Sequence, residues 1–240
     1  MRCDATLGAA VSHRVAARLG HPSLPAELVA RAFHEAVTVD PGIGQAFRAD
    51  IGAVIDRDPA TLRALEPVLY FKGFHALQAY RLAHHVWHRG RRDLALYLQS
   101  RISEVFQCDI HPAAKIGRGV FLDHATGPVV GSTAVIEDDV SILHAATLGG
   151  TGKQRGDRHP KIRRGLLIGA RPQILGNIAV GACARAAVPR SVTSLSRLSI
   201  RNALRAGMVR MDSSSAGGLV STSVRPFWSV TLAMSQGFTR

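Results

Sequence analysis

The sequence predicts an α+β fold in which an N-terminal α-helical domain precedes a parallel β-helix of hexapeptide repeats. The main observation is an aliphatic residue at every sixth position from Ile110 onward, with one slip of two residues and one polar interruption. The repeating positions are Ile110, Ile116, Leu122, Val130, Ile136, Ile142, Leu148, Ile162, Ile168, Ile174 and Val180. An α-helix repeats every 3.6 residues and a strand every 2, whereas a coil with three flat faces places one inward aliphatic on each face. The 23 glycines and the aromatic content of only 5% fit such a solenoid of tight turns.

Residues 1–107 carry helix-forming sequence with the signals that start and stop helices. One helix is expected to begin after Pro25, because proline favours the first helical turn, and to end at Asp40-Pro41-Gly42. Three more helices are expected at 43–57, 62–89 and 93–106. Asp58-Pro59 ends the first of these three, since the residue before a proline is pushed out of helical geometry.

The β-helix is expected over residues 108–181, broken once by a Gly-rich, charged loop at 149–161. Loops carried on rigid scaffolds are where binding residues concentrate. This one is not a phosphate-binding loop, because it lacks the string GxxxxGKS or GxxxxGKT. Residues 182–240 keep some sixfold spacing but lose the glycine and acidic positions, and they hold 11 Ser, 8 Arg and one acid. We interpret them as an atypical, aberrant tail; the alternative is a genuine tail that folds as extra coils.

The composition excludes several classes of protein. Of the net charge of +13, +7 lies in residues 182–240, which argues against a nucleic-acid-binding surface. The sequence contains no apolar run of about 18 residues, so no membrane span is predicted, and no signal peptide is recognised. Cys3, Cys108 and Cys183 are widely spaced, which favours free thiols in a reducing cytoplasm over disulfides or a zinc site. We interpret His84 and His88 as surface and groove histidines, so no metal is expected.

Five ionisable residues of the predicted coil are candidates for chemistry: Asp109, Asp123, His124, Arg158 and His159. Histidine is the side chain best suited to general-base catalysis near neutral pH. A carboxylate that accepts a hydrogen bond from one imidazole nitrogen would fix its tautomer. Asp109 precedes His124 by 15 residues, about one turn of the coil, and Asp123 is its neighbour in the sequence, so both are candidates for that carboxylate. From the residues alone, solvated coil positions are the alternative.

Four strings of this sequence resemble the serine acetyltransferases, a family of hexapeptide-repeat acyltransferases. They are KGFHALQAYR at 72–81, DIHPAAKIG at 109–117, LDHATG at 122–127 and GDRHPKI at 156–162. The match runs in order over residues 7–181, and the strings together are specific where a single hexad is not. The resemblance implies a left-handed β-helix that transfers an acetyl group from acetyl-CoA to L-serine, giving O-acetyl-L-serine for cysteine biosynthesis.

The resemblance also implies a role for each matching residue. His124 would be the general base that takes the serine hydroxyl proton, with Asp109 as its orienting carboxylate. Four residues would bind the substrate: Asp58, Asp123, Arg158 and His159. The two carboxylates among them would hold the ammonium group, Arg158 would hold the carboxylate, and His159 would complete the pocket.

For the co-substrate and partners, the resemblance implies acetyl-CoA, no metal and no covalent enzyme intermediate. Acetyl-CoA would contact Gly150, Thr151, Ala170 and Arg185. L-cysteine, isosteric with serine, would act as a feedback inhibitor. The family forms homotrimers, usually paired into hexamers, with each active site between neighbouring coils; because the sequence begins partway into the family's helical domain, trimer and hexamer both stay open. Docking to cysteine synthase is not expected, since the sequence ends in Arg240 where many members have isoleucine.

The chain departs from the family at Pro128, at 169–172 and throughout 182–240. In the family the last of these regions builds one wall of the coenzyme A site. One alternative is therefore an impaired or non-catalytic member that binds serine or cysteine but not coenzyme A.

Two further alternatives differ in chemistry. The first is an acetyltransferase for another hydroxyl acceptor, such as a sugar or homoserine, although Asp58, Arg158 and His159 favour a zwitterionic amino acid. The second is a metal-dependent, carbonic-anhydrase-like β-helix. That enzyme needs three histidines meeting between subunits, and His124, His144 and His159 lack the usual close pair.

Overall fold

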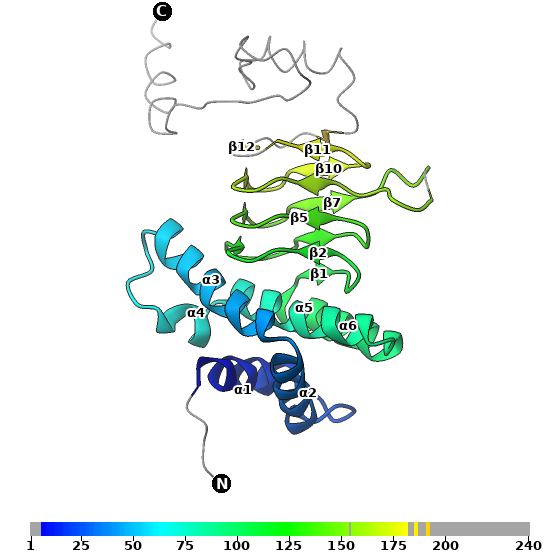
Figure 1. Ribbon diagram of the computed structural model, residues 1–240. Helices are drawn as coiled ribbons and strands as arrows, with labels where there is room; N and C mark the ends of the chain where they lie inside the picture. The colour runs from blue at the N-terminus through cyan, green and yellow to red at the C-terminus, as the bar shows by residue number, and fades with distance from the viewer. Residues whose placement is uncertain (1–5, 154, 182–184, 187–190, 193–240) are drawn as a thin grey trace, which may run out of the picture.

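The computed structural model describes residues 6–153, 155–181, 185–186 and 191–192, with the helices at the base of a stack of short strands (Figure 1). The helices are α1 (Leu7–Leu19), α2 (Ala26–Val39), α3 (Pro41–Arg57), α4 (Leu65–Leu69), α5 (Lys72–His88) and α6 (Arg92–Phe106). The strands are β1 (Asp109–Ile110), β2 (Lys115–Ile116), β3 (Phe121–Leu122), β4 (Val129–Val130), β5 (Val135–Ile136), β6 (Ser141–Ile142), β7 (Thr147–Gly149), β8 (Lys161–Ile162), β9 (Leu167–Ile168), β10 (Gln173–Leu175), β11 (Ala179–Val180), β12 (Arg185–Ala186) and β13 (Ser191–Val192). No helix in the described part of the chain is long and apolar enough to cross a membrane.

The helical part differs from the sequence prediction in two places. The sequence analysis did not predict α1 as a separate helix. Thr6 caps α1 by accepting a hydrogen bond from the Ala9 amide at 3.2 Å. The single helix predicted over 62–89 is wrong, because α4 and α5 are separate. Pro67 lacks the amide hydrogen that a longer helix would need, so α4 is short. Phe71 then adopts an extended conformation, which separates the two helices.

The strands form three parallel sheets, which are the three faces of a coil. The strand orders are β1-β4-β7-β10-β13, β2-β5-β8-β11 and β3-β6-β9-β12, so each strand pairs with the third strand before or after it in the sequence. Every pairing is parallel, as Asp109 opposite Val129 and Val129 opposite Thr147 illustrate. The predicted parallel β-helix is therefore confirmed. The sixfold aliphatic positions point inward: Ile110, Ile136, Leu148, Ile162 and Ile168 are all buried.

The helices and the first coil share one hydrophobic core, and a buried carboxylate joins them. Asp50 of α3 is 0% exposed. Its Oδ2 accepts from Arg81 Nη2 at 2.7 Å, and its Oδ1 accepts from the backbone amide of Val120 at 3.0 Å. Arg81 also donates to the Gly117 carbonyl at 2.8 Å. The first coil is thus anchored on α3 and α5, immediately before the strand that leads to His124.

The coil continues past residue 181, where the sequence analysis placed its end. Strand β12 pairs with β9, and β13 pairs with β10, both in the register of the coils below. The side chains of these two strands, and the rest of the predicted tail, lie outside the described residues.

Candidate active site

Most of the functional candidates lie at two of the three edges of the coil. We call one the His124 edge; it joins the β3-β6-β9 face to the β4-β7-β10 face through segments 123–128, 143–146 and 169–172. We call the other the His159 edge; it joins the β1-β4-β7 face to the β2-β5-β8 face through segments 111–114, 131–134 and 150–160. The last of these segments is the loop beside β7 in Figure 1.

His124 projects from the His124 edge into solvent. It adopts a left-handed backbone conformation with φ 55°, and its side chain is 76% exposed. Its Nε2 lies 3.7 Å from Asp123 Oδ1, and its ring lies 6.3 Å from the ring of His144 in the coil above. An exposed imidazole beside a carboxylate can accept a proton from a hydroxyl group brought against it.

The carboxylates predicted near His124 occupy different positions. Asp109 begins β1 next to this edge, where its amide donates to the Pro128 carbonyl at 2.9 Å. Its Oδ1 accepts from Gln99 Nε2 of α6 at 2.7 Å. The structure thus pairs His124 with Asp123 and pairs Asp109 with Gln99.

Asp58 follows the last residue of α3 and is held by its own turn. It accepts from the Ala60 amide at 2.9 Å and from Thr61 Oγ1 at 2.8 Å. The neighbouring Arg57 donates to the Gly119 carbonyl at 3.0 Å and to Ser141 Oγ at 3.2 Å. These contacts place the end of α3 against the face that contains β3 and β6.

The His159 edge is built around Thr133. The Thr133 hydroxyl oxygen accepts from the backbone amides of Arg158 at 3.0 Å and His159 at 3.2 Å. It lies 2.7 Å from His159 Nδ1, which also accepts from the Thr133 amide at 3.2 Å. With Nδ1 accepting, the imidazole carries its proton on Nε2.

The surroundings of His159 favour its neutral form and fix its position. Burial lowers the pKa of His159 below its ordinary value, and the charges of Arg158 and Lys161 lower that pKa further. A Cβ on Gly131 would lie 2.0 Å from His159 Nε2, so only glycine leaves room for the ring. Thr133 and Gly131 were missed by the sequence analysis, because nothing in the hexad pattern shows that the loop returns over residues 131–133.

The residues predicted to contact acetyl-CoA are divided between the two edges. Gly150 and Thr151 begin the loop of the His159 edge, and the Arg158 side chain lies across Gly150, where a Cβ would be 3.2 Å from Arg158 Cδ. Ala170 lies on the His124 edge, in the third coil. The side chain of Arg185 is outside the described residues.

A single copy of the chain does not bring the two groups of residues together. One whole face of the coil separates the edges, on the order of 15 Å of chain at about 3.3 Å per residue. A small amino acid cannot span that distance. The arrangement can therefore act on a small substrate only if the His124 edge of one copy meets the His159 edge of another.

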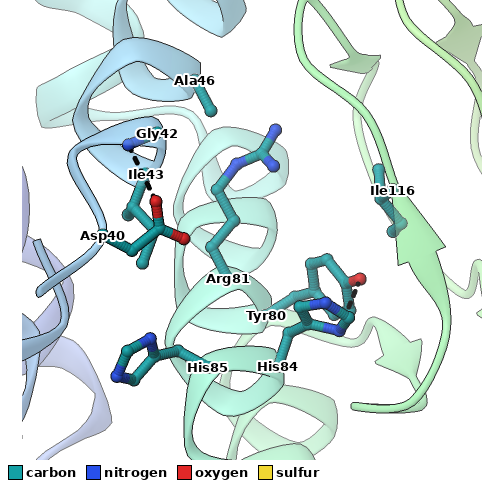
Figure 2. A pocket seen from close by; sticks show the side chains of 9 residues that line it. All are labelled: Asp40, Gly42, Ile43, Ala46, Tyr80, Arg81, His84, His85 and Ile116. Atoms are coloured by element: carbon teal, nitrogen blue, oxygen red, sulfur yellow. Dashed lines mark hydrogen bonds between the residues drawn. The ribbon is translucent and has the colours of Figure 1, made fainter. Parts of the chain in front are cut away.

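A surface pocket of about 180 Å³ lies between the helices and the first coil. Figure 2 shows its lining, which comes from the start of α3, from α5 and from β2: Asp40, Gly42, Ile43, Ala46, Tyr80, Arg81, His84, His85 and Ile116. None of the predicted site residues is among them. In this region His84 Nδ1 donates to the Pro112 carbonyl at 2.7 Å, as expected of a groove histidine. Among the described residues, no group of three or more His, Cys, Asp or Glu side chains is placed to hold a metal ion.

The chain is similar to known proteins of one family in sequence and in fold. The N-terminal family model of serine acetyltransferases matches residues 2–79. The chain is 59% identical over 175 residues to the serine acetyltransferase of Salmonella typhimurium, covering 73% of this chain but only 64% of that relative. The described fold is similar to the serine acetyltransferase of Brucella abortus in complex with coenzyme A, with a TM-score of 0.75, 54% identity, and coverage of 80% of this chain and 81% of the other.

Two further solved structures hold amino acids. The Neisseria gonorrhoeae serine acetyltransferase in complex with serine matches with a TM-score of 0.77 and 46% identity, over 79% of this chain and 78% of that one. A serine acetyltransferase in complex with cysteine matches with a TM-score of 0.74 and 48% identity, over 79% of this chain and 83% of that one.

Proposed function

Because this chain belongs to the serine acetyltransferase family, we propose that it transfers the acetyl group of acetyl-CoA to the hydroxyl group of L-serine. The products are O-acetyl-L-serine and free coenzyme A, and the reaction serves cysteine biosynthesis. The observation that carries the proposal is the pair of edges that bear the family's site residues, in a chain more than half identical to an enzyme solved with coenzyme A.

His124 takes the proton of the serine hydroxyl group, and the oxygen attacks the thioester carbonyl of acetyl-CoA. The carbon–sulfur bond then breaks, and the coenzyme A thiol leaves with a proton. Asp109 or Asp123 holds the imidazole during this step; the distance of 3.7 Å supports Asp123, and the family motif supports Asp109. Cys108 takes no part as a nucleophile, because it is buried and burial raises the pKa of its thiol to about 12. We expect both substrates to react while bound together, with no covalent enzyme intermediate.

The serine zwitterion is held from two sides. Asp58 and Asp123 bind its ammonium group, while Arg158 and the Nε2 hydrogen of His159 bind its carboxylate. Because a neutral His159 can donate one hydrogen bond, its lowered pKa does not prevent this contact. L-cysteine has the same shape and binds in the same place, as an inhibitor.

The site forms between copies of the chain. A cyclic homotrimer brings the His124 edge of each copy against the His159 edge of the next one, and a dimer of trimers repeats that contact. Acetyl-CoA binds along the same contact between copies, at Gly150, Thr151, Ala170 and Arg185. The coil is left-handed, as in the family. The enzyme acts in the cytoplasm.

The proposal is tested by following release of coenzyme A thiol from acetyl-CoA with L-serine, L-homoserine or a galactoside as acceptor. We expect turnover with L-serine. Replacing His124 with alanine should lower kcat by about 10²-fold to 10⁴-fold, the usual contribution of a general base. The melting temperature of the protein should not fall, because the side chain of His124 is exposed. His34→Ala, at an exposed histidine of α2, is the matched control.

Equal turnover by the wild type and His124→Ala would contradict the assignment of the base. A preference for the galactoside would overturn the acceptor. If calorimetry shows that L-serine binds while coenzyme A does not, the chain is the non-catalytic member of the family that its Ser- and Arg-rich residues 182–240 allow.

A further inference from the structure

The corner of the coil that carries His124 differs from the two described corners stacked above it. The corner between β3 and β4 contains six residues, 123–128. The two equivalent turns above contain four residues each, 143–146 and 169–172. The upper corners each contain one non-glycine residue in the left-handed region, Ala145 and Arg171. The first corner contains two in succession, His124 with φ 55° and Ala125 with φ 45°. Such strain persists only where the surroundings hold it in place.

The start of helix α5 lies directly against this corner. A Cβ on Gly73 would be 2.1 Å from the Leu122 carbonyl oxygen and 2.9 Å from Ala125 Cβ. Ala125 is only 1% exposed, although its neighbour His124 projects into solvent. The helix therefore buries one side of the corner and leaves the catalytic ring free on the other side.

Polar contacts from both ends of the α5–α6 hairpin hold the corner as well. Lys72 Nζ donates to Thr126 Oγ1 at 2.6 Å and to Gln107 Oε1 at 3.2 Å. The Gln107 carbonyl accepts from the Gly127 amide at 2.9 Å. Among the described residues, no carboxylate lies within ion-pairing distance of the Lys72 ammonium group, so both of its contacts are neutral oxygens that bracket the corner. The corner itself is closed by the Ala125 amide, which donates to the Asp123 carbonyl at 2.6 Å.

We propose that Lys72 and Gly73 are positioning residues that hold the strained 123–128 corner and thereby aim His124 at the substrate. The helical domain then serves catalysis. Gly73 allows the helix to approach, and Lys72 links Thr126 to the last turn of α6. This inference rests on the proposed role of His124 as the base, but the geometry of the corner can be measured without activity.

The test compares the full chain with Lys72→Met, which keeps the aliphatic length and removes the donor, and with Lys72→Arg, which restores donors. Lys115→Met, at an exposed lysine of β2, is the matched control. We expect Lys72→Met to lower kcat by about 10²-fold, the cost of misplacing a catalytic group by an ångström, with KM for acetyl-CoA nearly unchanged. Lys72→Arg should recover most of the loss.

A second readout is amide hydrogen exchange at Ala125 and Gly127. We expect both amides to exchange at least about tenfold faster in Lys72→Met and at the wild-type rate in Lys115→Met. If the Gly73→Ala variant folds, the Ala125 and Gly127 amides should exchange faster in it as well. Exchange at the wild-type rate in Lys72→Met overturns the proposal, whether or not kcat falls. Faster exchange with an unchanged kcat overturns it too. If the wild type does not acetylate serine, the proposed function fails, while the exchange measurement still decides whether Lys72 holds the corner.

Discussion

At the scale of single residues, buried groups in this chain have protonation states fixed by their contacts. His75 of α5 is 0% exposed. Its Nε2 hydrogen donates to the Val68 carbonyl at 2.7 Å, and its Nδ1 accepts from Arg18 Nη1 at 3.2 Å. A second proton would have to sit on Nδ1, facing a guanidinium group. Burial lowers the pKa of His75 to about 4, and Arg18 and Arg14 lower this pKa as well.

The lowered pKa of His75 predicts a pH dependence of stability. Below its ordinary pKa of 6.5 the unfolded chain takes up a proton on His75 that the folded chain refuses until about pH 4. The stabilisation is therefore complete above 6.5 and is lost as the pH falls towards 4. Between about pH 7 and about pH 5 the free energy of unfolding should fall by about 2 kcal/mol more in the wild type than in His75→Gln. Urea denaturation at the two pH values measures this difference; equal losses in both proteins would contradict it.

The sequence singled out ionisable candidates for the site but not the residues that hold them. His124 and His159 stand out because histidine is the natural base near neutral pH and because their strings match a family. Thr133 and Gly131 do not stand out, since their importance arises only when a loop about 26 residues further along folds back over them. The sixfold repeat also did not predict that His124 and Arg158 lie on two different edges. It predicts the three faces of the coil but not which edges of two copies come into contact.

At the scale of elements, helix α5 links the parts of the molecule. Tyr80 donates its hydroxyl hydrogen to the Ala114 carbonyl at 2.5 Å, and Arg81 reaches the Gly117 carbonyl while paired with Asp50. These contacts bind the helices to the first coil at two successive turns. The separate α4 was not predicted, because the apolar pattern over 62–89 continues across the break that Pro67 and the extended Phe71 make.

Removing Asp50 should destabilise the whole junction. Asp50→Ala leaves Arg81 buried without its counter-ion and leaves the Val120 amide without its acceptor. Breaking one side of a buried pair costs about 3–5 kcal/mol, so we expect a loss of that size in the free energy of unfolding. Asp56→Ala, at an exposed carboxylate of the same helix, is the control and should cost less than about 1 kcal/mol. Similar losses in the two variants would show that the Asp50 network does not hold the helices to the coil.

At the scale of the whole molecule, the regular coil was predictable because its repeat is written in the sequence, and the register of β1, β4, β7 and β10 follows the aliphatic positions. The repeat itself does not predict how the site assembles, because Asp109 and His124 lie one face away from Arg158 and His159; only the family resemblance implied a site between neighbouring coils. We propose that each site takes its base from one copy of the chain and its carboxylate-binding residues from the next.

Subunit complementation tests this claim most directly. His124→Ala and Arg158→Ala are each expected to be inactive, because every site in a homotrimer of either variant lacks one half. Co-expressed, the two variants should form mixed trimers in which about a quarter of the sites pair an intact His124 with an intact Arg158. Thiol release from acetyl-CoA with L-serine should therefore recover to about a quarter of the wild-type value in the mixed protein. If the mixture stays as inactive as its components although mixed trimers are present, both residues belong to a site within one copy, and the account is contradicted.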